Sequence, residues 1–493
     1  MSQTLASLPM LVEIFALLFS NRWMARWQKQ WAQQPPREIS TQASRKKNKK
    51  SQKKKKPKST PQRFYQRIFS LRVTLWYLIY QRLNFDATLA AVVRNVREGG
   101  ADRLGRRGRK LSKGVRSTQT SAYNQARQRM PLELLQAALA HLGQNLWKRV
   151  GWVSDSRKKP GPAQRVRQLL DGSTLAMLRT AELAAAFPPA RNKRGASDWC
   201  LMRIVVGFCA RSGAIFSALE GAVQQSEQAL AWTLMEQAAA FTLWIGDRNF
   251  GVWSVVAQAV RFRQDVLVRL TQARARKLCA GQPMHSGEQR LIQWHRSRND
   301  QAAPGTERKT VSGRLIYVRL HKGGKWIDLW LFTTLEAPGY PVELLVKWYG
   351  QRWQAELHFR SVKTQMKMAE LDVCTPEMAR KEFYAGLLAY SLVRAVMWGA
   401  GERLEQRIKT LSFSQTRRVL LERLKDWGRG LRAGRAEKWV RELMEEVARH
   451  TLPKRQKTRP SEIRRVRHRR LKFPSFKGSR AAARTRYMAT KSS

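Results

Sequence analysis

The spacing of hydrophobic residues divides the chain into stretches of different character. From residue 64 to about residue 150, apolar residues recur at intervals of three and four, which predicts a helical region. From about residue 161 to residue 270 they instead form short continuous runs, separated by turns or helical segments. We expect strands at residues 166–170, 202–210, 241–245 and 266–270. This alternation predicts an α/β domain.

A weaker pattern follows from about residue 271 to residue 338, where the chain is charged and contains glycines. Two short β-like runs, at residues 315–320 and 326–332, predict a β-rich insertion here. Long helices are predicted from about residue 342 to residue 446, because the spacing of three and four returns.

The ends of the chain have little periodic pattern. Residues 36–62 are rich in proline, serine and lysine, which predicts a disordered basic linker that serves either as a nonspecific phosphate contact or as a solubilising tether. Residues 454–484 are basic and poor in apolar residues, so we expect this tail to be disordered or extended on a polyanion. The apolar stretch 8–19 is shorter than the roughly 20 residues of a membrane span, and a short helix is expected.

Charge changes this picture more than any other property of the composition. The chain has 94 lysines and arginines against 35 acidic residues, a net charge of +59. Such a surface needs a polyanionic partner. Nucleic acid is the natural one, because a duplex carries about one negative charge per 1.7 Å of its axis. An anionic membrane surface is the competing interpretation.

Cysteine and histidine spacing argues against zinc. The four cysteines are far apart and form no CxxC pair, which favours a reducing compartment and excludes the usual structural zinc motifs. The seven histidines form no HxxxH or HExxH pattern, so histidine-based zinc chemistry is not expected.

Two aspartates follow predicted strands. Asp171 comes directly after the run 166–170 and precedes Gly172, so its carboxylate is expected where a strand ends. Asp247 has the same position after the run 241–245. Because an open α/β sheet binds ligands beyond the carboxyl ends of its strands, both aspartates would meet in one site if the strands are adjacent. Each is equally compatible with an ordinary surface turn.

A third carboxylate lies in a charged helical stripe. Tyr349, Arg352, Glu356 and Lys363 stand at relative positions 0, 3, 7 and 14, and at about 100° per residue they share one face of a helix. A carboxylate would then be flanked by cations that can bind phosphate. A solvent-facing ladder of Arg352, Glu356 and Arg360 at i,i+4 spacing explains the same residues, and spacing alone favours this interpretation.

This stripe resembles the tyrosine, arginine, glutamate and lysine signature of bacterial insertion-sequence transposases of family four, which are of the DDE type. Residues 169–174 and 246–250 resemble the two aspartate motifs of that family, in the same order. Further similar stretches are residues 121–127, 333–335 and 382–394. The resemblance covers about residues 63–480. It departs at Asn249, where the family usually has glycine, and in the lysine-rich segment before residue 60.

The resemblance implies an α/β fold with a ribonuclease-H-like catalytic domain, interrupted by a β-rich insertion and flanked by helical N- and C-terminal regions. We accordingly predict four regions. They are 1–62, a short apolar segment and lysine-rich linker; 63–160, a helical DNA-binding domain; 161–410, the catalytic domain with its insertion at about 271–338; and 411–493, a C-terminal helical region and basic tail.

The activity implied is that of a DNA transposase. Asp171, Asp247 and Glu356 would hold two Mg²⁺ ions, which Mn²⁺ can replace, for hydrolysis at a transposon end and attack of the freed 3′ hydroxyl on target DNA. Some members proceed through a hairpin intermediate. Tyr349, Arg352 and Lys363 are expected to hold phosphates beside the scissile bond.

Several other residues are candidates for DNA contact. By context, Trp330 resembles a family tryptophan that stacks on a flipped base, although it is equally typical of a β-hairpin core. Trp326 competes for that role, and Trp353 raises the same question. Arg127 and Arg129 lie near the end of a predicted helix that Ser121 would cap, where they could enter a groove or face solvent.

The partners implied are the terminal inverted repeats of a transposon and its target DNA, with a homodimer in the synaptic complex and a cytoplasmic, nucleoid-associated location. Two other functions remain open. One is a noncatalytic or decayed DNA-binding protein, and the other is a structure-selective nuclease on the same fold.

Overall fold

A computed structural model describes residues 21–32, 68–105, 109–152, 165–192, 195–196, 199–307, 309–322, 324–403, 408–429, 435–453 and 479–489. The chain forms two compact units, Met1–Leu452 and Pro453–Ser493. The predicted apolar segment 8–19 and the linker 36–62 lie outside the described residues, as does most of the tail. Residues 480–484 belong to helix α16 (Arg480–Ala489), so the expectation of an extended tail is wrong for them.

The N-terminal part of the first unit is helical, as its spacing predicts. Its main helices are α2 (Asn21–Ala32), α3 (Leu71–Leu83), α4 (Leu89–Arg97), α5 (Ser121–Arg129) and α6 (Leu132–Trp152). Helix α3 begins at its cap Ser70, whose side chain accepts a hydrogen bond from the Val73 N–H at 3.4 Å. The predicted cap Ser121 is instead the first residue of α5, after Thr120, which makes no side-chain cap.

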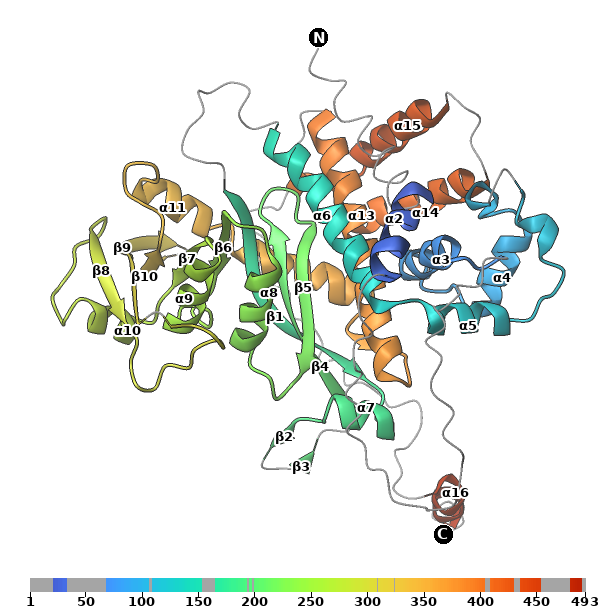
Figure 1. Ribbon diagram of the computed structural model, residues 1–493, viewed down its shortest axis with the longest axis horizontal. Helices are drawn as coiled ribbons and strands as arrows, with labels where there is room; N and C mark the ends of the chain where they lie inside the picture. The colour runs from blue at the N-terminus through green and yellow to red at the C-terminus, as the bar shows by residue number, and fades with distance from the viewer. Residues whose placement is uncertain are drawn as a thin grey trace. The chain divides into compact units, whose positions relative to one another are not determined.

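A mixed sheet forms the centre of the first unit (Figure 1). Its strands lie in the order β5-β4-β1-β6-β7-β10-β9-β8, and the short β11 pairs with β1. The strand bounds are β1 (Val166–Met177), β4 (Cys200–Cys209), β5 (Ile215–Ala222), β6 (Thr242–Gly246), β7 (Asp265–Arg269), β8 (Gln289–His295), β9 (Thr310–Lys322), β10 (Lys325–Thr333) and β11 (Glu370–Leu371). A second small sheet pairs β2 (Arg191–Asn192) with β3 (Gly195–Ala196). The prediction of an α/β domain is confirmed.

Strand directions divide the main sheet into segments. Strands β5, β4 and β1 are antiparallel neighbours, whereas β1, β6 and β7 run parallel. Strand β10 then pairs antiparallel with β7 through residues 331–333. The β-rich insertion therefore continues the central sheet.

The predicted strands agree with the structure except at the carboxyl end of β1. Strand β1 does not stop before Gly172, because β4 continues to pair with it as far as Met177. The expected turn after Asp171 is therefore wrong. Strands β5 and β8 were not predicted at all.

Helices cover both faces of the sheet. They are α7 (Ala181–Ala186), α8 (Glu227–Gln237), α9 (Trp253–Arg261), α10 (Gln272–Leu278), α11 (Val342–Tyr349), α12 (Trp353–Arg360) and α13 (Pro376–Arg403). Adjacent strand residues belong to different cores: Leu169 to the core that contains Tyr390 of α13, and Leu170 to the core that contains Trp253 of α9. Successive strand side chains point to opposite faces, so the central strands are buried on both sides.

Helix α13 joins the sheet to the helical region, together with α6, which also packs on β5. It packs against α3, α6 and β5, and against α14 (Phe413–Arg429) and α15 (Arg435–Arg449), with α6 alongside it (Figure 1). Its length and composition would allow it to cross a membrane, but 94% of its most apolar window is buried inside the protein. It is placed as a core helix of the first unit.

Candidate active site

The two predicted aspartates lie at the end of one parallel strand pair. Leu170 of β1 pairs with Gly246 of β6. Asp171 directly follows Leu170, and Asp247 directly follows Gly246. Strand β6 ends there, whereas Asp171 remains in β1, opposite Val206 of β4. The backbone register therefore brings the two aspartates to the same level of the sheet, although only Asp247 follows the end of its strand.

Local hydrogen bonds orient both carboxylates. The Gly172 N–H donates to Oδ1 of Asp171 at 3.0 Å, and the Asn249 N–H donates to Oδ1 of Asp247 at 2.9 Å. Burial raises the pKa of Asp171 to about 6; the Gly172 hydrogen bond opposes this rise and the nearby negative charge of Asp247 adds to it. Two carboxylates that are partly removed from water are stabilised by a cation between them.

The signature residues do not lie on one continuous α-helix, so that expectation is corrected. Tyr349 ends α11, residues 350–352 form a turn, Glu356 lies on α12, and Lys363 lies in a π-helical segment, Ser361–Gln365. The turn at Gly350 and the wider π turn shift the side-chain directions away from a uniform 100° step.

These segments nevertheless face the strand that carries Asp171. The Lys363 ammonium donates to Oγ of Ser173 at 3.1 Å, two residues beyond Asp171. Arg352 is close enough to Asp171 to lower the pKa of that carboxyl. Helix α12 also packs on β1. The structure thus brings Arg352 and Lys363 to the aspartates.

Glu356 has a different partner. Its Oε1 accepts a hydrogen bond from Nη2 of Arg352 at 2.6 Å, and its side chain is 40% exposed. This contact is the i,i+4 pair of the charged ladder that the spacing also allowed. Glu356 therefore lies on a helix that packs against β1, and its carboxylate is held by an arginine.

Tyr349 is buried beneath this ion pair. Burial raises the pKa of its hydroxyl to about 12, and the positive charges of Arg352 and Arg269 limit the rise. The hydroxyl therefore stays protonated at neutral pH. It can donate a hydrogen bond to a phosphate oxygen but does not supply negative charge.

The chemistry of these residues suits a hard divalent cation. Carboxylate oxygens are the ligands that Mg²⁺ prefers, and Asp171 and Asp247 supply them side by side. Within the described residues, however, no three His, Cys, Asp or Glu side chains are gathered closely enough to hold a metal ion. A site of three carboxylates would require Glu356 to lie closer to the two aspartates than it does in this conformation.

The predicted base-stacking residue Trp330 is in the hairpin core. It is only 8% exposed, and its ring stacks on Tyr317 with the centroids 4.3 Å apart. Trp326 is 62% exposed, with the Arg319 guanidinium 5.2 Å from its ring centroid. Trp353 is 59% exposed. In this conformation the exposed rings that a base could reach belong to Trp326 and Trp353, whereas Trp330 has the hairpin-core placement that was its alternative.

Arg127 is held inside the protein rather than at a groove-facing surface. Its guanidinium forms an ion pair with Glu382 of α13, and Arg82 of α3 pairs with the other oxygen of the same carboxylate. The expected DNA contact is therefore replaced by a link between helices. Arg129 is exposed at the end of α5.

One acidic residue near the site was not predicted. Glu227 is the first residue of α8, and its carboxylate accepts a hydrogen bond from the Asn249 amide at 2.7 Å. The cap Ser226 before it marks a helix start, but a glutamate in a first turn is common and gives no sign of its distant neighbours.

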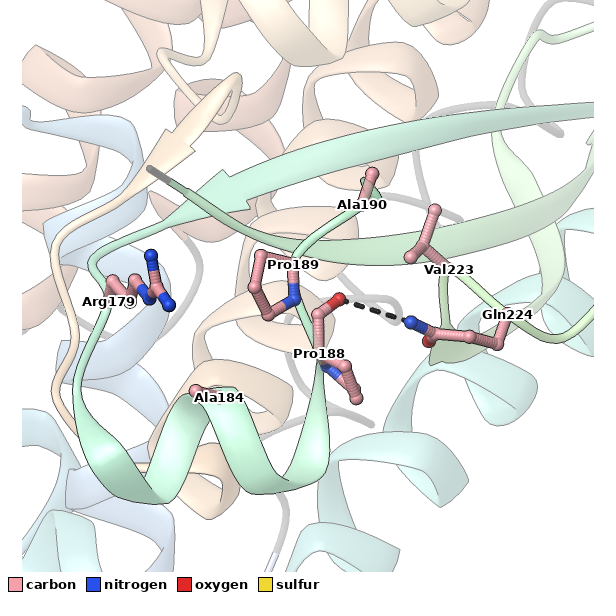
Figure 2. A pocket seen from close by; sticks show the side chains of 7 residues that line it. All are labelled: Arg179, Ala184, Pro188, Pro189, Ala190, Val223 and Gln224. Atoms are coloured by element: carbon pink, nitrogen blue, oxygen red, sulfur yellow. Dashed lines mark hydrogen bonds between the residues drawn. The ribbon is translucent and has the colours of Figure 1, made fainter. Parts of the chain in front are cut away.

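A separate pocket lies beyond the far end of β1 (Figure 2). Arg179, Pro188 and Val223 are among its lining residues, and the Gln224 amide donates to the Pro188 carbonyl across it at 3.5 Å. None of the predicted site residues lines it, so the chemistry described above lies elsewhere on β1.

Two of the comparisons with known proteins point to transposases through the sequence. Residues 162–392 match the family described as the Transposase DDE domain. The transposase InsG of insertion sequence element IS4 from Escherichia coli (strain K12) is 26% identical over 335 residues, which are 66% of this chain and 71% of that protein. A solved piggyBac transposase synaptic complex with hairpin DNA aligns with 91% of this chain and 87% of its own, at 10% identity and a TM-score of 0.38, too low to carry an argument.

The match of residues 162–392 to the transposase domain and the similarity to InsG together support the class of protein: a DNA transposase. Within that class, the chain is similar to the transposase of the insertion sequence element IS4.

Proposed function

We propose that this transposase cleaves the ends of its element and joins the freed 3′ hydroxyls to target DNA, in a cut-and-paste reaction. The observation that carries the proposal is the pairing of Leu170 with Gly246, which sets Asp171 and Asp247 side by side. The Lys363 contact with Ser173 adds support, because it fastens the segment that bears Glu356 to the same strand.

Asp171, Asp247 and Glu356 would hold the divalent ions, two Mg²⁺ in the complete site, with Mn²⁺ as a substitute. When bound, such ions activate an attacking oxygen and stabilise the leaving oxygen of a phosphodiester. Arg352 then has a second role. Once Glu356 leaves it, its guanidinium can receive a phosphate through two parallel hydrogen bonds.

Lys363 and Tyr349 complete the phosphate contacts in this proposal. The Lys363 ammonium supplies a point charge next to the strand of Asp171. Burial lowers the pKa of this ammonium group. The buried hydroxyl of Tyr349 donates a hydrogen bond. These groups orient the DNA backbone, and neither of them accepts a proton in the reaction.

The ribonuclease-H-like character of the domain is part of the proposal. That fold consists of a three-stranded antiparallel meander whose first strand is extended by two parallel strands. The order β5-β4-β1-β6-β7, with antiparallel pairs on one side of β1 and parallel pairs on the other, supports this assignment. Strands β8–β10 would then be the insertion.

The partners would be the terminal repeats of the element and its target DNA, bound by a homodimer in a synaptic complex in the bacterial cytoplasm. The net charge of +59 supports a nucleic-acid partner. Exposed rings at Trp326 and Trp353 would offer stacking surfaces for unpaired bases, each worth roughly 1 to 3 kcal/mol.

The test uses DNA that carries the sequences flanking the coding region, with the full chain and Mg²⁺. Cleavage at the element ends followed by strand transfer to a second DNA supports the proposal. Cleavage without joining would identify a nuclease instead. Binding without cleavage under any divalent metal would identify a noncatalytic DNA-binding protein.

A further inference from the structure

Hydrogen bonds from helix α8 hold the turn that carries Asp247. Besides the Asn249 N–H bond to Asp247, the Asn249 side-chain amide donates to Oε2 of Glu227 at 2.7 Å. The adjacent Gln228 amide donates to the Asn249 backbone carbonyl at 2.9 Å. Two successive residues at the start of α8 thus bind one residue of the turn, through its side chain and its backbone.

Glu227 also lies against the strand of the other aspartate. A Cβ atom on Gly172 would be 2.6 Å from both carboxylate oxygens of Glu227, closer than any real contact allows. A side chain at position 172 would therefore push this carboxylate away from its place beside Asp171. The start of α8 favours a negative charge, because the unpaired N–H groups of a first helical turn carry partial positive charge.

Glu227 is therefore wedged between the two segments that carry the aspartates. It contacts β1 at Gly172 and the turn after β6 through Asn249. The backbone register sets the spacing of the two segments, but β6 ends at Gly246 and leaves Asp247 outside the ladder. The Glu227–Asn249 bond supplies the support that the strand no longer gives.

We infer that Glu227 and Asn249 are positioning residues, which fix the turn of Asp247 against β1 so that its carboxylate faces the metal beside Asp171. This inference rests on the proposed function. Partners that orient metal-ligating side chains commonly change metal affinity by 10- to 100-fold when they are removed. Glu227 acts here as a hydrogen-bond acceptor, so its oxygen matters more than its charge.

The experiment measures Mn²⁺ binding to the full chain at neutral pH by isothermal titration calorimetry, together with the thermal unfolding of each variant. Glu227→Ala and Asn249→Ala should each weaken Mn²⁺ binding about 10-fold or more. Glu227→Gln, which keeps an acceptor oxygen, should restore most of that loss. Glu236→Ala, at an exposed acidic position on the same helix, is the matched control and should bind as the wild type does.

Each other result overturns a defined part of the inference. If Glu227→Gln binds as weakly as Glu227→Ala, the charge is needed and Glu227 is itself a ligand. If Asn249→Ala binds Mn²⁺ normally, the positioning role is wrong; this exposed variant tests it without a large risk to folding. Asp171→Asn separates the two proposals: if it also binds Mn²⁺ normally, the metal site of the proposed function fails as well.

Discussion

The carboxylates of this transposase are held in two different ways. Asp171 lies in the backbone ladder of β1, and Asp247 directly follows Gly246, the last residue of β6, which pairs with Leu170. Glu356 lies on α12, and its carboxylate is bound to Arg352. Strand pairing thus brings two carboxylates to one level of the sheet, whereas the third lies on a helix and is bound to an arginine.

The largest effect should come from the strand-held pair. Asp171→Asn keeps the shape of the side chain but removes a charged ligand, and end cleavage should fall by about 10³-fold or more. Single-turnover cleavage in Mg²⁺ measures it. Binding to the same DNA, followed by gel shift, should be unchanged, and an equal loss of DNA binding would contradict the assignment.

Arg352→Gln should distinguish the aspartates, which strand pairing places, from Glu356, which Arg352 binds. Without the guanidinium, Glu356 is released and Mn²⁺ affinity should not fall, yet cleavage should drop by about 10²-fold because a phosphate contact is lost. Calorimetry and single-turnover cleavage on the same protein test both halves. A clear loss of Mn²⁺ affinity would show that Arg352 helps to build the metal site, and the contrast with Asp171 would disappear.

Stability against pH should reveal the cost of burying Asp171 without metal. Its folded pKa of about 6 lies above the ordinary 3.8, so the unfolded chain ionises first as pH rises and stability falls between about pH 4 and pH 6. Asp171→Asn removes this cost, roughly 1 to 3 kcal/mol at neutral pH. In EDTA at neutral pH the variant should melt at a higher temperature than the wild type.

The gain should shrink as the pH falls towards 3.8 and be lost well below it, where the carboxyl is protonated in both the folded and the unfolded chain. Saturating Mn²⁺ should reverse the order at neutral pH, because only the wild type keeps both aspartates as ligands. A constant difference across this pH range would refute the electrostatic explanation.

The smallest effect is expected at the hydrogen bond between Lys363 and Ser173 of β1. Ser173→Ala removes the acceptor for Lys363 and should cost about 1 kcal/mol, a few-fold in cleavage. Ser173→Thr retains the hydroxyl and serves as the control. If both variants cleave at the wild-type rate, the contact does not help to hold the segment of Glu356.

The sequence was most informative where local pattern and tertiary pairing agree. The run 241–245 predicts β6 and the turn at Asp247, because a buried strand and its turn are both local features. The end of β1 was wrong because Gly172 and Ser173 are typical of turns, whereas β4, distant in the chain, pairs with both of them. Strand β8 was not predicted because its exposed face carries Leu291. An apolar residue on that face interrupts the alternation of polar and apolar residues that indicates a strand.

Partners far apart in the chain account for the remaining differences. Arg127 looks like a surface cation in its own helix, and only the approach of Glu382, 255 residues later, shows that it is an internal ion pair. The nearness of Glu227 to Asn249 is equally invisible in either local segment. The family signature places Glu356 on the helix that packs against β1, but the spacing of its residues does not disclose the turn at Gly350.

The pairing of β10 with β7 fixes the distance between the insertion and the central strands. Because β8 and β9 continue one hydrogen-bonded sheet from β6, β9 lies three strand spacings from β6 and β8 lies four, about 19 Å. Lengthening a loop cannot alter that separation, whereas deleting a strand would. The number of strands in the insertion thus sets how far its outer edge stands from the aspartate at the end of β6.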